Sequence, residues 1–284
     1  MICTEWRDMD DLELRHGLPD DLPQLFAEPT AGRALSVGLP AGDVVWPDPG
    51  YRQNRLTTRP AFWLTDDPVP PDLWPRLRAE HPGSGLWPLL MDESDQPWAA
   101  GQIAPEPLAD IAAFEPTAFM YEVWTEWAEQ ADDVDLANLA PFGEHCPGLA
   151  PRGGRIADPD ALADDHARVL AERGPSLGLV AVDRGADALA AVGWQGALNH
   201  NEWTAPLAAV VRSWEERFGV RVVGLGFNTL ELSVAAPPVT TRHALHVAAE
   251  HWAFCPDILF QGPGTLAGYA EELRGKRYWS FWWD

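Results

Sequence analysis

Apolar and polar residues alternate most clearly in the C-terminal third of the chain. Apolar side chains recur at helical spacing from Leu207 to Phe218, with Thr204 placed to cap the helix and Gly219 to end it. A run rich in branched residues, VRVVGLGF, follows, and after Asn228 the sequence LELSV has the period of a half-buried strand. The pattern predicts a helix followed by an antiparallel hairpin that turns at Asn228.

A second helix is expected after this hairpin. Pro237 and Pro238 stop the preceding strand, Thr240 or Thr241 can cap the helix, and Pro256 forbids its continuation. The residues that should share its buried face are Ala244, Val247, Ala248 and His251.

The same criteria predict elements in the rest of the chain. Asp72 should cap a helix that Pro82 ends, and Asp160 should cap another that Gly174 ends. The inward residues of the helix at 160–174 should be Leu162, His166, Val169 and Leu170. The remaining helices are expected at 117–130, 186–194 and 265–275, and the remaining strands at 33–48, 61–67, 84–92, 176–183 and 278–284.

Residues 141–159, PFGEHCPGLAPRGGRIADP, interrupt this pattern because helices and strands tolerate Gly and Pro poorly in their interiors. They are interpreted as a linker between an N-terminal α+β region, residues 1–140, and a C-terminal domain, residues 160–284. The order of elements predicts the α+β class. We expect a C-terminal antiparallel sheet with helices packed on one face, a ferredoxin-like variant, preceded by a mixed α/β N-terminal region.

Charge bears on function more than any motif does. The 284 residues include 43 acidic and 20 basic side chains, for a net charge of −23, and such a field repels nucleic-acid phosphates. No Lys or Arg stands between Arg78 and Arg152, whereas acidic residues run from Glu80 to Glu144. This stretch is interpreted either as a solvated face or as a docking surface for a basic partner, a mimic of nucleic acid included.

Composition also indicates the compartment. No run of about 18 apolar residues is present, so no membrane span is expected, and the acidic start MICTEWRDMDD is unlike a secretory signal. Cys3, Cys146 and Cys255 are too few and too far apart for a disulfide framework, which favours the reducing cytosol. Most of the 15 tryptophans follow core spacing, and the surplus favours an interface.

Three separated motifs carry a family resemblance. RSWEERFG at 212–219, AAEHWAFCPD at 248–257 and YWSFWWD at 278–284 together resemble the DUF4253 family, a domain of unknown function from bacterial, often actinobacterial, proteins. The resemblance covers about 176–284, and HPGSGLWPLLM at 81–91 is similar to the segment that accompanies the domain. It implies a C-terminal DUF4253-like domain and names no reaction.

The candidates for chemistry gather near the end of the second helix: Glu250, His251, Cys255 and Asp257. His251 and Cys255 are four residues apart, and a thiol beside an imidazole is the arrangement of a cysteine nucleophile. However, Cys255 stands at a helix C-terminus, where the macrodipole opposes thiolate formation. The competing interpretation makes Cys255 a small buried residue and His251 a hydrogen-bonded core residue.

Other constellations are incomplete. A metal site would draw on His243, His246, Glu250 and His251, but HALHVAAEH has neither the H-E-x-x-H nor the H-x-x-E-H spacing. VGLGF lacks the third glycine of a dinucleotide loop. Because both patterns are incomplete, we expect neither a metal nor a cofactor. We interpret these charged residues as a buried ion-pair network that joins the two helices to the loop after Pro256. The residues are Glu215, Arg217, Glu250 and Asp257.

The leading hypothesis is a cytosolic, non-enzymatic protein-interaction or regulatory module with a basic protein partner, with no nucleic-acid or membrane partner. An immunity or inhibitor protein that neutralises a basic toxin is one specific form of it. The residues expected to make contacts are Trp214, Glu215, Arg217, Trp282 and Asp284. The alternative is an enzyme or small-ligand binder whose pocket lies over the C-terminal sheet, lined by Trp214, His251, Trp282 and Asp284.

Overall fold

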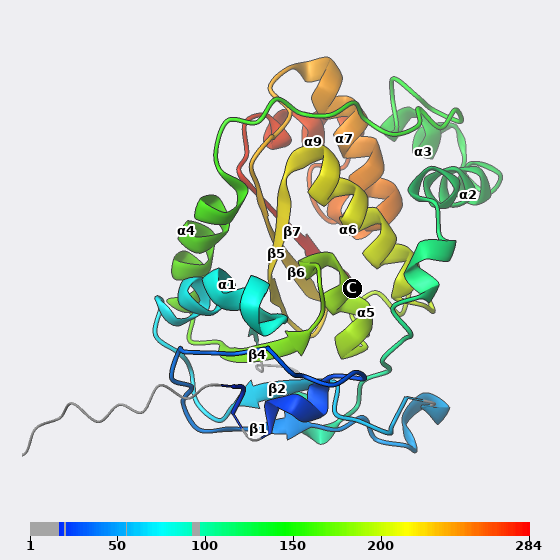
Figure 1. Ribbon diagram of the computed structural model, residues 1–284. Coiled ribbons are helices and arrows are strands. Elements are labelled where there is room, and N and C mark those ends of the chain that lie inside the picture. The colour runs from blue at the N-terminus through cyan, green and yellow to red at the C-terminus, as the bar shows by residue number, and fades with distance from the viewer. Residues whose placement is uncertain (1–16, 20, 55, 93–96) are drawn as a thin grey trace, which may run out of the picture.

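The computed structural model describes residues 17–19, 21–54, 56–92 and 97–284. The acidic start of the chain and Cys3 lie outside these residues. The described strands form one mixed sheet in the order β1-β2-β4-β3-β5-β6-β7 (Figure 1). The strands are β1 (Gly42–Val45), β2 (Phe62–Thr65), β3 (Leu86–Met91), β4 (Ser176–Ala181), β5 (Val220–Leu225), β6 (Thr229–Val234) and β7 (Tyr278–Trp282).

The helices fall mainly between the strands. They are α1 (Leu73–Ser84), α2 (Pro116–Ala128), α3 (Asp133–Asn138), α4 (Pro159–Ala171), α5 (Ala188–Val192), α6 (Ala205–Phe218), α7 (Thr241–Phe254), α8 (Asp257–Phe260) and α9 (Leu266–Leu273). Short 3₁₀ helices occupy Leu22–Leu25, Tyr51–Gln53, Trp98–Ala100, Asp110–Ala113 and Gly185–Asp187. The helix, hairpin and second helix predicted in the C-terminal third are all present, as α6, β5 with β6, and α7.

One sheet spans both sides of the expected linker. β4 pairs antiparallel with β2 and with β3, so a strand from beyond residue 159 lies between two strands from before residue 141. β3 then pairs parallel with β5, whereas β5, β6 and β7 are antiparallel neighbours. The α+β class is confirmed. The C-terminal strands β5, β6 and β7 are antiparallel as expected, and the parallel pairing of β5 with β3 makes the whole sheet mixed. The division into regions 1–140 and 160–284 stays a prediction.

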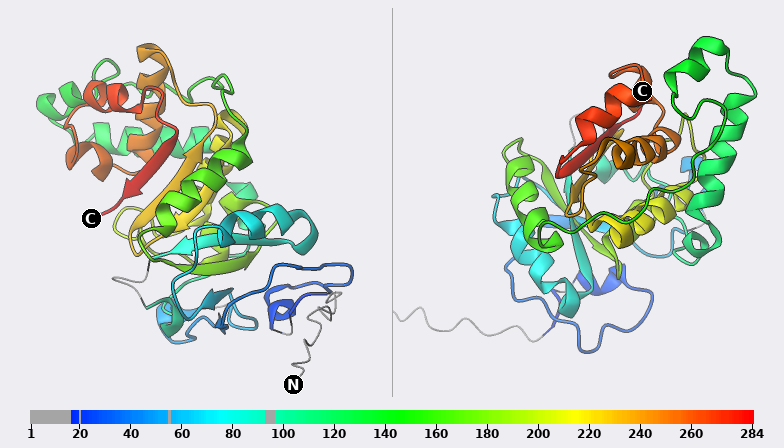
Figure 2. Two further views of the ribbon diagram at one scale, coloured as in Figure 1. Left: turned by 90° about the vertical axis from the view of Figure 1, so that its left-hand side faces the viewer. Right: turned by 90° about the horizontal axis from the view of Figure 1, so that it is seen from above.

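Helices cover both faces of the sheet, where we expected one (Figures 1 and 2). α1 and α4 pack over β3, β5 and β6 on one face, and α6 packs on β5 from the other. The run VRVVGL supplies apolar side chains to both faces of β5, which explains the second layer. The ferredoxin-like template, which has a single helical layer, does not fit this arrangement.

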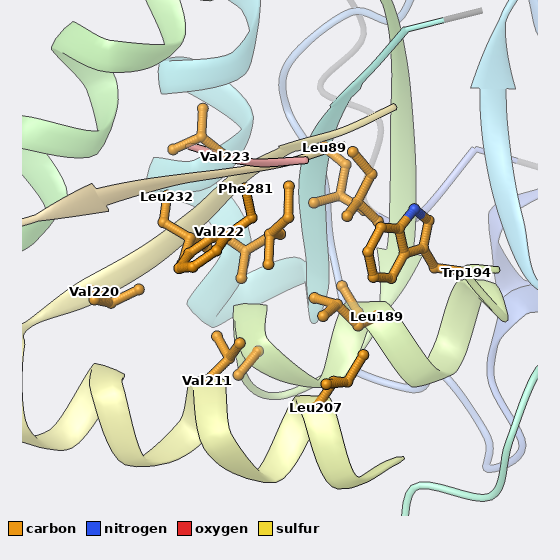
Figure 3. Close-up of a cluster of buried hydrophobic side chains, with 14 of the residues drawn as sticks. Leu89, Leu189, Trp194, Leu207, Val211, Val220, Val222, Val223, Leu232 and Phe281 are labelled. Atoms are coloured by element: carbon orange, nitrogen blue, oxygen red, sulfur yellow. The ribbon is translucent and has the colours of Figure 1, made fainter. Parts of the chain in front are cut away.

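One part of the core lies between the sheet and α6. Figure 3 shows Val211 of α6 pointing toward Val222 of β5, and Leu207 pointing toward Leu189 of α5. Large rings fill much of the remaining volume, in agreement with the prediction that most tryptophans are core residues. The fully buried tryptophans are Trp74, Trp98, Trp124, Trp194, Trp214, Trp252, Trp279 and Trp283.

The starts of α6 and α4 differ from the predictions. The side chain of Thr204 does not cap α6; instead the Glu106 carboxylate accepts the N–H groups of Thr204 and Ala205 at 2.6 and 2.8 Å. Asp158, rather than Asp160, caps α4 by accepting two backbone N–H groups. The cap from Glu106 is a tertiary contact and leaves no local sequence signal, whereas the cap from Asp158 is local and lies two residues before the predicted one.

The buried face of α4, both ends of α1 and the strands in residues 33–48 also differ from the predictions. The inward face of α4 consists of Ala163, Ala167 and Leu170, and Val169 is exposed, because α4 packs closely on β5 and β6 through small residues. α1 continues through Pro82 to Ser84, and Gly85 ends it with a φ of 72°. Asp72 makes no cap bond and pairs with Arg168 instead. Residues 33–48 hold only one strand, β1.

The Gly/Pro-rich segment 141–159 is held against the C-terminal elements by backbone hydrogen bonds. The Gly153 N–H donates to the carbonyl of Arg217 at 3.1 Å, and the Ile156 N–H to that of Ala235 at 2.9 Å. A Cβ at Gly153 would stand 2.0 Å from the Ala236 carbonyl oxygen, so this position requires glycine. Most of the segment forms neither helix nor strand. Its backbone hydrogen bonds to Arg217 and Ala235 nevertheless hold it in place.

Candidate functional site

The Glu250 carboxylate lies at the centre of a buried hydrogen-bond network between α6 and α7. Oε1 accepts from the Ala150 N–H at 2.6 Å and from Arg217 Nη1 at 2.7 Å. Oε2 accepts from Trp214 Nε1 at 2.8 Å and from Arg217 Nη2 at 2.5 Å. Arg217 Nη1 also donates to the Ala150 carbonyl at 2.8 Å. Each carboxylate oxygen thus receives two hydrogen bonds, which satisfies the capacity of the group.

This network ties three segments together. Trp214 and Arg217 come from α6, Glu250 from α7 and Ala150 from the segment 141–159. Sequence reasoning placed Arg217 and Glu250 in one network with Glu215 and Asp257 and joined that network to the loop after Pro256. The structure joins the pair of Arg217 and Glu250 to Ala150 instead.

His251 is a core residue without exposed surface. Its ring lies 4.3 Å from Trp279, 4.8 Å from Phe281 and 5.0 Å from Trp214, measured between ring centroids. Nδ1 is 3.0 Å from the Tyr269 hydroxyl, and Nε2 has no hydrogen-bond partner among the described residues. Burial lowers the pKa of His251 well below its ordinary value, so the ring is neutral at neutral pH.

Cys255 is buried at the end of α7. Its Sγ lies 3.1 Å from the Trp282 carbonyl oxygen, and burial raises the pKa of the thiol to about 12. The imidazole of His251 bonds to Tyr269, and the hydrogen bond between His251 and Cys255 joins only backbone atoms. The geometry therefore gives no support to a cysteine nucleophile, because the thiolate is the reactive form.

Asp257 takes part in a separate cluster that holds Asp284. Asp257 Oδ2 lies 2.9 Å from His200 Nε2 and accepts the Asp284 N–H at 3.1 Å. Gln261 bonds to both carboxylates, and Asn199 donates to the Asp284 carbonyl at 2.6 Å. His200 and Asn199 were not predicted, since residues 195–203 carry no periodic pattern. The cluster fixes Asp284 beside α8.

Glu215 lies on another side of α6 and pairs with Arg184. Oε2 is 2.9 Å from Arg184 Nε, and Oε1 accepts the Ala186 N–H at 3.0 Å. Burial raises the pKa of Glu215, against the opposing effect of Arg184. The pair borders a cavity of about 330 Å³, where two further lining arginines are also paired, Arg78 with Asp164 and Arg221 with Asp160. This pocket was not predicted, because its residues come from five separate segments.

The structure does not bring together the four residues expected to line a pocket over the C-terminal sheet. Trp214 and His251 touch in the core, whereas Trp282 and Asp284 are exposed. Side chains alternate along β7, so the Trp282 ring lies on the opposite face from Trp279 and Phe281. Within the described part of the chain, no three His, Cys, Asp or Glu residues are placed to hold a metal ion.

Within the acidic stretch from Glu80 to Glu144, the helices α2 and α3 lie at the periphery of the molecule (Figure 2). α2 buries Met120 and Trp124, and the Trp124 ring lies 4.8 Å from Trp252 of α7. The opposite side exposes Tyr121, and Val134 of α3 is exposed nearby in sequence. The exposed acids here that make no side-chain hydrogen bond or ion pair with described residues are Glu115, Glu122, Glu126, Glu129 and Asp133.

The structure is that of an α+β protein in which the ion pairs of Arg217 with Glu250 and of Arg184 with Glu215 hold α6 to its neighbours. The family model described as "Domain of unknown function (DUF4253)" matches residues 176–284, which confirms the resemblance for that segment. The match contains β4 to β7 and Glu250, and α2 and α3 lie outside it. No curated protein and no solved structure matches the chain. None of the described helices combines the length and the apolar character needed to traverse a membrane.

Proposed function

We propose that the chain is a non-enzymatic protein-interaction module that binds a basic protein partner through α2 and α3. One observation carries the proposal: five carboxylates on these helices are exposed and have no partner among the described residues. Unpaired surface charges of one sign attract a partner of the other sign and speed its association. We call these five carboxylates, together with the exposed side chains of Tyr121 and Val134, the acidic surface; the carboxylates are Glu115, Glu122, Glu126, Glu129 and Asp133.

Apolar side chains on and beside the acidic surface support a contact that is more than electrostatic. Tyr121 is 61% exposed and Val134 is 67% exposed. Phe260 of α8 is 43% exposed and stacks on Trp127 of α2 with a centroid distance of 6.1 Å. Exposed aromatic residues surrounded by charge are typical of the residues that dominate binding energy at interfaces.

The buried residues support the same proposal from the other direction. Glu250, His251 and Cys255 are engaged in packing and in internal hydrogen bonds, which leaves them no contact to offer a substrate. The specific form we favour is an immunity or inhibitor protein that neutralises a basic toxin, since a net charge of −23 suits a strongly basic target.

The test is capture of partners from a cell lysate by the immobilised chain at low and at high salt. The variant combines Glu122→Gln, Glu126→Gln and Glu129→Gln. We expect a basic protein to be retained at low salt, to be released at high salt and to be absent from the variant.

A matched control removes three negative charges elsewhere. Asp66, Asp67 and Glu172 are exposed and have no side-chain partner among the described residues, and all three are changed to the amide. The control should retain the same basic protein. Equal loss from control and variant would show that net charge alone is responsible, and capture of no protein by the unmodified chain would oppose the proposal.

A further inference from the structure

A cavity of about 460 Å³ opens where the N-terminal region meets the segment matched by the family model. Its walls come from residues 25–27, from residues 56–61 before β2 and from residues 105–108. Ala181 at the end of β4 and Ala191 of α5 complete it. The volume lies in the range of roughly 300–1,000 Å³ that small-molecule sites occupy.

Most of the lining residues have apolar side chains, and Thr58, Arg59 and Glu106 supply the polar ones. Leucine side chains supply much of the wall, and alanines at 61, 181 and 191 leave the space open. The Phe26 ring is fixed by the Arg33 guanidinium, which stands 4.5 Å from its centroid. The wall is thus held in place by the protein's own contacts.

The two charged lining residues are not equivalent. The Glu106 carboxylate is committed to the start of α6, where it accepts the N–H groups of Thr204 and Ala205. The negative charge is compensated there by the positive end of the helix dipole. Arg59 makes no side-chain hydrogen bond or ion pair with described residues, although the chain carries 43 acidic side chains. Among the described residues, the cavity lining therefore includes an exposed cation without an acidic partner, next to leucine side chains.

We propose that this cavity binds a small amphipathic anion, an apolar body that carries one carboxylate. The carboxylate pairs with the Arg59 guanidinium, whose fork of donors matches it in geometry. The apolar body lies against Leu25, Leu56 and Leu108. The cavity shares no residue with the acidic surface. Ligand binding in the cavity can therefore be tested separately from the proposed partner binding.

Calorimetric titration tests the proposal with defined probes. Octanoate and 3-phenylpropionate supply an aliphatic and an aromatic carboxylate, and octanol and octylamine supply a neutral and a cationic head on the aliphatic body. We expect at least one carboxylate to bind at least about tenfold more tightly than octanol, and octylamine not to bind, since charge-assisted hydrogen bonds are the strong ones.

Three variants locate the binding. Arg59→Gln should remove the preference for the carboxylate, and Arg76→Gln, at an exposed arginine that lines neither cavity, should leave it unchanged. Ala191→Leu should fill the cavity and abolish binding, with folding checked by circular dichroism. Should that variant not fold, the two arginine variants still decide. Absence of binding by both carboxylates, or equal binding by the Arg59→Gln variant, would overturn the proposal.

Discussion

Glu250 shows how one residue can look catalytic in sequence and serve structure in the fold. Its neighbours in sequence include a histidine and a cysteine, yet its carboxylate is saturated by Arg217, Trp214 and the Ala150 N–H. A buried ion pair is sensitive to the loss of either partner, because the remaining charge is left without compensation in a medium of low polarity. The same contacts that exclude a substrate therefore make Glu250 a residue on which folding depends.

Substitution of Glu250 tests this role. Glu250→Gln should lower the free energy of unfolding by about 3–5 kcal/mol, as should Arg217→Met, since each leaves a buried charge unpaired. The double variant should lose less than the sum of the two. Urea unfolding measures all three, and Glu271→Gln, which breaks the exposed pair with Arg274, is the control that should have no measurable effect. Strict additivity would contradict the account.

His251 should make stability depend on pH. Its pKa is lowered by burial in the folded state and has its ordinary value of about 6.5 in the unfolded state. The unfolded chain therefore binds the proton first as the pH falls. The contribution of the neutral ring is fully present above about pH 6.5 and is lost below it, at up to about 1.4 kcal/mol per pH unit.

The comparison that isolates this effect is between the unmodified chain and His251→Phe. Urea unfolding at a series of pH values from 7.5 to 5 should show the unmodified chain losing stability more steeply than the variant. Two parallel curves across this range would mean that His251 can be protonated in the folded state.

At the scale of elements, α5 depends on the glycine that ends it. Gly193 has a φ of 69°, and a Cβ there would stand 2.2 Å from backbone atoms of Ala104 and Pro105. The end of α5 is therefore in direct contact with the N-terminal region, and the Ala104 N–H donates to the Gly193 carbonyl at 2.9 Å. Two separate requirements, left-handed backbone and close approach, meet at this residue.

A matched pair of glycines separates the two requirements. Gly275 also has a φ of 69°, but a Cβ there would meet nothing within 4 Å. Gly275→Ala should cost about 1–2 kcal/mol for the left-handed conformation alone. Gly193→Ala should cost a further 1–3 kcal/mol or so for the clash with backbone. Thermal unfolding of the two variants gives the difference directly, and equal losses would contradict the close approach.

The sequence predicted most elements because their signals are local. The helix and hairpin from residue 204 to residue 234 follow from apolar spacing and from Gly219 and Asn228, and α7 follows from Thr240 and Pro256. What it did not predict depends on tertiary contacts. The caps from Glu106 and the position of β4 between β2 and β3 join residues about 100 apart.

The candidate site divides in the same way. The membership of Arg217 and Glu250 in one ion-pair network could be predicted because the two residue types match in charge and lie on helices that were themselves predicted. Glu215 and Asp257 pair instead with Arg184 and His200. Neither partner lies in a periodic segment, so no sequence pattern indicated either contact.

At the scale of the whole molecule, charge and packing are segregated. The ion pairs of Arg217 with Glu250 and of Arg184 with Glu215 connect α6 to its neighbours, and exposed carboxylates without a partner among the described residues lie on α2 and α3 at the periphery. Residues 79–151 contain no Lys or Arg, so this region has no basic residue of its own near in sequence to neutralise it. We infer that the acidic surface is the part of the molecule available to a partner, while the DUF4253 segment provides its support.

The most direct test of this account is calorimetric titration of the captured basic partner into the unmodified chain, into the variant of Glu122, Glu126 and Glu129, and into the control variant. The account predicts that affinity for the first variant is at least about tenfold lower and depends less on salt, because salt-sensitive contacts have been removed. The control variant should bind like the unmodified chain. Equal affinity of all three proteins, with the same dependence on salt, would contradict the assignment of partner binding to α2 and α3.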